Sequence, residues 1–129
     1  MGNKTQKMVE KFKKILMKIK ESRGAVSVFA IIKMDEITDK WSVVFSAHWI
    51  DKENKTEVFN YLRGLLLEHL SAEEIPTIAR LGLFLNNEHL IQLILKSVKV
   101  ENGEVNLKDT ALNGYKIHEA YIFESNIAE

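Results

Sequence analysis

The chain has 129 residues, of which 46% are hydrophobic, with equal numbers of basic and acidic side chains and no cysteine. This length suits one domain with its own core, and the lack of cysteine excludes disulfides, thiolate metal sites and a cysteine nucleophile. Lysines interrupt the apolar residues near the N-terminus, so neither a secretory signal nor a membrane-spanning helix is predicted. We therefore expect a cytoplasmic protein with a single domain over residues 1–129.

A basic amphipathic helix is predicted at the N-terminus, over residues 5–22. Its apolar residues recur at the spacing that places them on one face; they are Met8, Val9, Phe12, Ile15, Leu16 and Ile19. Gly24 is expected to end the helix, because glycine tolerates the left-handed conformation of a helix C-cap. Residues 1–23 carry eight basic and two acidic side chains, whereas the remainder carries ten basic and sixteen acidic ones. This segment is interpreted as a basic helix docked on an acidic body.

The lysines of this helix suggest an alternative role for it. Lys7, Lys11, Lys14 and Lys18 recur at three- to four-residue spacing and form what we call the cationic strip. Such a strip can follow the phosphates of a nucleic acid. It lacks the interleaved arginine and aromatic side chains that read bases or stack on them.

Two strands are predicted next, over residues 25–34 and 41–50, because both segments are short and rich in β-branched or aromatic residues. A polar turn at residues 35–40 is expected to join them in an antiparallel hairpin. Alternation places Trp41, Phe45 and Trp49 on one face of the second strand. These aromatic side chains are expected to pack in the core, or else to form a partner-binding surface if that face is open.

A second helix is predicted over residues 55–70, followed by a strand over 78–85 and a short helix over 88–96. The apolar stripe of the second helix contains Val58, Phe59, Leu62, Leu65, Leu66 and Leu70. Ser71 and Glu74 have the spacing of a capping box, and Pro76 limits any helix that starts there. The inward residues of the short helix are Leu90, Ile91, Ile94 and Leu95.

The C-terminal part is predicted to contain strands. Asn102-Gly103 lies within residues 98–107 and suits a tight hairpin turn. Residues 108–114 are expected to be irregular, and residues 115–125 to form the last strand. The order α-β-β-α-β-α-β-β-β predicts an α+β domain with about three helices packed on a mixed, mostly antiparallel sheet.

Two segments carry a resemblance to known proteins. Residues 39–50, with the sequence DKWSVVFSAHWI, and residues 117–125, with the sequence IHEAYIFES, resemble strands in a family of small uncharacterised prokaryotic single-domain proteins. Residues 70–75 also fit the pattern of that family. The resemblance implies a compact cytoplasmic domain, and it transfers neither an activity nor a site.

Few residues suggest catalysis. His48 lies near the end of a predicted strand and close to Asp51, and a histidine beside a carboxylate can act as a general base. The alternative is a surface histidine with local hydrogen bonds. Asp35, Glu36, Asp39 and Asp51 flank the hairpin but lack a calcium-loop pattern. Phosphate-loop, nucleophile-elbow and histidine-ligand motifs are absent, so no cofactor and no metal are predicted.

The leading hypothesis is therefore a protein–protein interaction or regulatory module without catalysis, acting as a homodimer or with another gene product. The first alternative is a nucleic-acid-associated protein that uses the cationic strip. The second is an enzyme that uses His48 and nearby carboxylates. No membrane partner is predicted.

Overall fold

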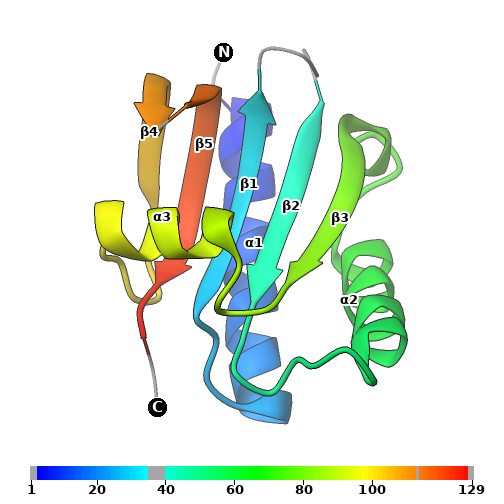
Figure 1. The fold of residues 1–129 in the computed structure, drawn as a ribbon. Helices are drawn as coiled ribbons and strands as arrows, with labels where there is room; N and C mark the ends of the chain where they lie inside the picture. The colour runs from blue at the N-terminus through cyan, green and yellow to red at the C-terminus, as the bar shows by residue number, and fades with distance from the viewer. Residues whose placement is uncertain (1–2, 35–39, 113, 128–129) are drawn as a thin grey trace.

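Three helices and a five-stranded sheet make up the fold in a computed structural model that describes residues 3–34, 40–112 and 114–127. In chain order the elements are α1 (Asn3–Arg23), β1 (Val28–Met34), β2 (Trp41–Ser46), α2 (Lys55–His69), the 3₁₀ turn η1 (Ile75–Thr77), β3 (Ile78–Phe84), α3 (His89–Ser97), β4 (Val105–Leu112) and β5 (Tyr115–Ser125). The predicted α+β class, with a mixed and mostly antiparallel sheet, is confirmed (Figure 1).

The strands lie in the order β3-β2-β1-β5-β4, so β3 and β4 form the two edges of the sheet. Three of the four pairs are antiparallel, and only β2 and β3 run parallel. This difference follows from the connections. α2 lies between β2 and β3 in the chain and provides the long crossover that a parallel pair requires.

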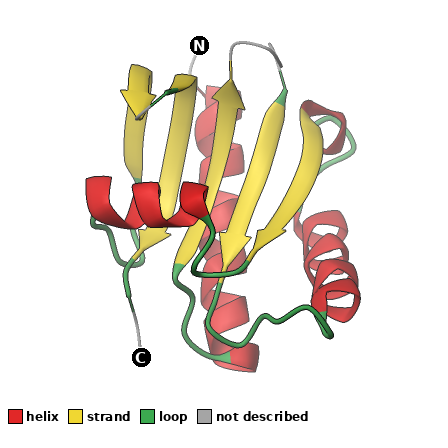
Figure 2. Cartoon of the chain, viewed as in Figure 1, coloured by secondary structure: helices red, strands yellow, loops and turns green. Residues whose placement is uncertain are grey.

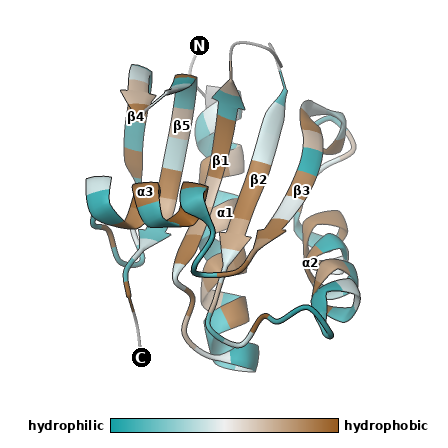
Figure 3. Ribbon diagram, in the orientation of Figure 1, coloured by the Kyte–Doolittle hydropathy of each residue, from teal (hydrophilic) through white to brown (hydrophobic). Residues whose placement is uncertain are grey.

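The sheet separates two layers of helices. Figure 2 shows α1 and α2 behind the sheet and α3 in front of it. Strand residues alternate between these layers: Phe29 and Ile31 pack with α1, whereas Ala30 and Ile32 pack with α3. β1 is hydrophobic along most of its length (Figure 3), as expected for a central strand that is buried on both faces.

α1 forms as predicted and is held by its apolar face. All six of its predicted core residues are at most 4% exposed. Gly24 has a φ of +107°, and its N–H donates to the Lys20 carbonyl at 3.1 Å. A glycine C-cap therefore ends the helix, because side chains rarely adopt that backbone conformation.

β2 is shorter than predicted and ends at Ser46. The next residues turn instead, and the Ile50 N–H donates to the Ala47 carbonyl at 3.1 Å. The Trp49 indole N–H donates to the Ala25 carbonyl at 2.8 Å. These hydrogen bonds stabilise a turn, and His48 and Trp49 consequently lie outside the strand.

The hairpin predicted at Asn102-Gly103 is wrong. Before β4, only an isolated bridge joins Val100 to Ser125. The β4–β5 hairpin turns later, where Leu112 pairs with Tyr115, and Gly114 adopts a φ of +95°. Residues 105–112 form one continuous strand, so the irregular segment predicted at 108–114 is wrong over most of its length.

Candidate functional site

The aromatic residues of β2 belong to the core. Trp41 is 3% exposed and Phe45 is fully buried, and both pack in the cluster beneath α1 and α2. Trp49 is partly buried against the same cluster. The expectation of core packing is confirmed, and the alternative of an open aromatic face is wrong because these helices cover it.

His48 and Asp51 are exposed residues of the segment that follows β2. One carboxylate oxygen of Asp51 accepts the backbone N–H groups of Glu53 and Asn54, both at 2.8 Å. This carboxylate therefore organises the start of α2. Within the described parts of the chain, no group of three or more acidic or histidine side chains is placed to hold a metal ion. Asp35, Glu36 and Asp39 lie outside the described residues.

Ion pairs attach α1 to the acidic body. The Nζ atoms of Lys11, Lys13 and Lys20 lie 2.7, 3.1 and 2.9 Å from carboxylate oxygens of Glu74, Glu104 and Glu124, respectively. This arrangement supports the docked interpretation of the basic helix. The other members of the cationic strip are Lys7, Lys14 and Lys18, which are exposed and have no carboxylate partner among the described residues.

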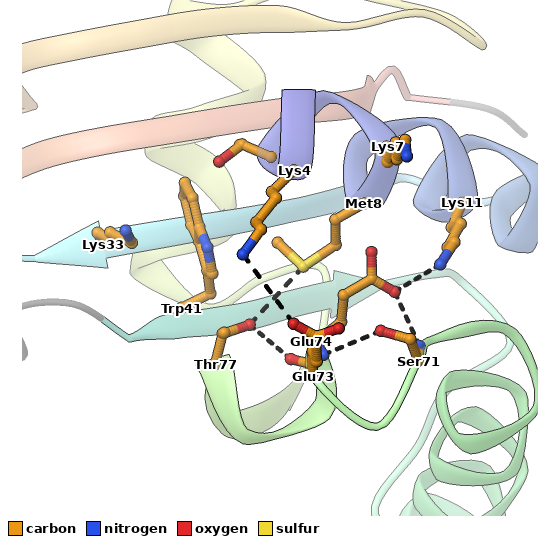
Figure 4. A pocket seen from close by; sticks show the side chains of 11 residues that line it. Lys4, Lys7, Met8, Lys11, Lys33, Trp41, Ser71, Glu73, Glu74 and Thr77 are labelled. Atoms are coloured by element: carbon orange, nitrogen blue, oxygen red, sulfur yellow. Dashed lines mark hydrogen bonds and ion pairs between the residues drawn. The ribbon is translucent and has the colours of Figure 1, made fainter. Parts of the chain in front are cut away.

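A hollow of about 510 Å³ lies between the start of α1, the β1–β2 end of the sheet and the segment before β3 (Figure 4). Its charged groups are largely engaged with one another. Lys11 binds Glu74, the Lys4 Nζ lies 4.0 Å from Glu73, and the Lys33 Nζ lies 4.6 Å from the centroid of the Trp41 ring. The hollow is therefore a junction that joins α1 to the rest of the fold.

The capping box predicted for Ser71 and Glu74, which both line this hollow, is confirmed. The Ser71 N–H donates to the Glu74 carboxylate at 2.8 Å, and the Glu74 N–H donates to the Ser71 hydroxyl at 3.2 Å. Burial raises the pKa of Glu74, but hydrogen bonds from Lys11 and Ser71 outweigh it and hold that pKa below its usual value. Glu74 therefore serves as a charged structural link.

A second hollow, of about 300 Å³, lies between α2 and β3, and we call it the α2–β3 groove. It is lined by Phe59, Arg63, Leu66, Leu67, Leu70, Ile75, Ile78, Ala79, Arg80 and Leu81. The lining is apolar apart from two arginines, and neither arginine has a carboxylate partner among the described residues.

Phe59 corrects the predicted stripe of α2. Val58 and Leu62 are buried as expected, but Phe59 is 38% exposed and Leu67 is 46% exposed. Phe59, Arg63 and Leu67 follow each other at four-residue spacing, so they share one side of the helix. That side borders the groove, and α2 consequently presents two large apolar side chains to solvent.

The two edges of the sheet differ in their protection. β4 carries the charged residues Lys108 and Asp109, and its pairing with β5 keeps one register along its length, with a φ of +46° at Asp109. Charged side chains on an edge strand discourage edge-to-edge association. β3 has Arg80 as its single charged residue; its register with β2 shifts at Ala79 and is regular from Arg80 to Phe84. From Arg80 to Phe84 the β3 edge is therefore open and weakly protected by charge.

Comparisons of the chain with protein-family models, with curated proteins and with solved structures found no match. Among the residues that the structure describes, no helix is both long enough and apolar enough to cross a membrane.

Proposed function

We propose that the protein is an interaction module without catalysis, and that it binds a protein partner at the α2–β3 groove. The observation that carries this proposal is an open edge strand directly beside exposed apolar side chains of α2. An unpaired strand edge is a template for another chain. Exposed apolar residues are ordinary when scattered, but here Phe59 and Leu67 border one continuous groove.

Site-specific photo-crosslinking in the native cells tests this function. A photoreactive amino acid replaces Leu67 in the groove, and in the control protein it replaces Met17, which is 47% exposed on α1. We expect one discrete protein adduct from position 67 and none from position 17. The adduct should disappear when Phe59→Ser is added, while thermal stability changes little because that side chain is partly exposed. Equal labelling from both positions, or no adduct from position 67, would contradict the proposal.

A second candidate function is association with nucleic acid through the cationic strip. The supporting observation is that Lys7, Lys14 and Lys18 remain exposed and lack carboxylate partners among the described residues. Contacts of this type are made with phosphates and weaken steeply as salt rises. This function uses the outer side of α1 and does not involve the α2–β3 groove.

Charge reversal tests this second candidate. Lys14→Glu combined with Lys18→Glu should greatly weaken binding to a short DNA duplex or a single-stranded RNA at low salt, measured by fluorescence anisotropy. The matched control reverses Lys96 and Lys99, two exposed lysines at the other side of the sheet. Equal losses in the two double variants, or no binding by the unaltered protein, would remove the candidate.

A further inference from the structure

We propose that the occupant of the α2–β3 groove is an extended, acidic and apolar segment of another protein, which joins the sheet as an additional strand beside β3. This inference rests on the proposed function and assigns the chemistry of its partner.

The strand edge determines the conformation of the occupant. β3 is paired on one side with β2, and no strand of the described residues lies on its other side. Its pairing from Arg80 to Phe84 is regular, so this part of the edge provides evenly spaced backbone donors and acceptors. An added strand satisfies such groups by main-chain hydrogen bonds. A helix has already paired its own backbone groups and would leave this edge unused.

The lining of the groove determines the apolar part of the occupant. Side chains of a strand alternate between the two faces of a sheet, so every second side chain of an added strand would point toward α2. There it would meet Phe59, Leu67 and Leu81. Apolar side chains at these alternate positions would remove the exposed parts of Phe59 and Leu67 from water, which is favourable.

The charges determine the acidic part. Arg63 and Arg80 are the charged residues of the lining, and they have no carboxylate partner among the described residues. Carboxylates on the occupant would form charge-assisted hydrogen bonds with these guanidinium groups. A second copy of this chain would instead bring two more arginines and no carboxylate from its own groove. Charge complementarity therefore favours a different, acidic chain.

Selection from a displayed library of random linear peptides, each at least as long as β3, provides the probe. We expect the selected sequences to alternate apolar residues with positions that include Asp or Glu. Two N-methylated versions of the best peptide, blocked on alternate sets of amides, distinguish a strand from other conformations. N-methylation of one set of amides should abolish binding, and N-methylation of the other set should leave it intact. The reason is that only every second amide of an added strand faces β3.

Charge-reversed variants of the protein locate the peptide. Arg63→Glu and Arg80→Glu should each weaken binding of the acidic peptide by about tenfold or more, whereas Lys14→Glu on the outer side of α1 should not. A peptide with Lys in place of its acidic residues should regain affinity for the reversed variants. This regain shows that the variants are folded, because a misfolded protein would bind neither peptide.

Four results would overturn this inference: selected peptides without acidic residues, equal effects of the two N-methylated sets, no peptide that binds at the groove, or a homodimer that Leu67→Glu dissociates. Light scattering measures whether the protein is a homodimer and whether Leu67→Glu dissociates it. None of these results removes the proposed function, which is tested separately by the adduct from position 67. An adduct with a folded, basic or helical partner would leave the function in place and contradict the assigned partner.

Discussion

Replacing Phe29 with alanine should lower the free energy of unfolding by about 3–5 kcal/mol, the range found when buried aromatic residues are truncated. Phe29 is 1% exposed, and its ring centroid lies 5.6 to 5.8 Å from those of Phe12, Phe45 and Phe123. These rings come from α1, β2 and β5. The substitution therefore opens a cavity where the helix meets three strands, and urea denaturation monitored by circular dichroism measures the loss.

Phe59→Ala is the matched control for this prediction. It removes the same side chain from a position that is 38% exposed at the groove, so less apolar area is lost and no enclosed cavity forms. We expect a clearly smaller loss of stability than for Phe29→Ala. Similar losses in the two variants would show that the aromatic cluster is not the centre of the core.

Replacing Lys20 with alanine should destabilise the fold by about 3–5 kcal/mol, because it leaves a buried carboxylate without its cation. Glu124 is 1% exposed, and one of its oxygens accepts from the Lys20 Nζ and from the Asn102 N–H, both at 2.9 Å. Thermal and urea unfolding of the variant measure the effect. Lys18→Ala is the control, since Lys18 is exposed and lies on the same helix.

A second substitution separates the buried charge from the packing of Lys20. Combining Lys20→Met with Glu124→Gln removes both charges, while the glutamine oxygen can still accept the Asn102 N–H. We expect this double variant to be much more stable than Lys20→Ala. If Lys20→Ala were no more harmful than Lys18→Ala, the ion pair would have no part in docking α1 on the sheet.

Local patterns in the sequence predicted most elements of the fold, since periodicity reports directly which face of an element is buried. The spacing from Met8 to Ile19 identified the buried face of α1, and the alternation at Trp41, Val43 and Phe45 identified the core face of β2. The local sequence does not determine the position of the β4–β5 turn. Asn-Gly occurs at 102–103 and at 113–114, and the pairing of β4 with β5 decides between them.

The candidate site depends on an arrangement that local patterns do not contain. Phe59 is adjacent to the buried Val58, and the apolar stripe of α2 predicts that it lies in the core. Its four-residue spacing with Arg63 and Leu67 indicates a second, outer stripe. Whether that stripe is exposed depends on where β3 lies. The parallel pairing of β3 with β2 places it at the sheet edge, and this non-local choice creates the groove.

Backbone amide hydrogen exchange, measured with and without the partner captured from position 67, tests most directly whether the protein acts through its open sheet edge. We predict that partner binding slows exchange in β3 and in α2, which border the groove, and leaves exchange at the β4 edge unchanged. Protection confined to the outer side of α1 or to β4, with β3 exchanging at its free rate, would contradict an interaction module built on the α2–β3 groove.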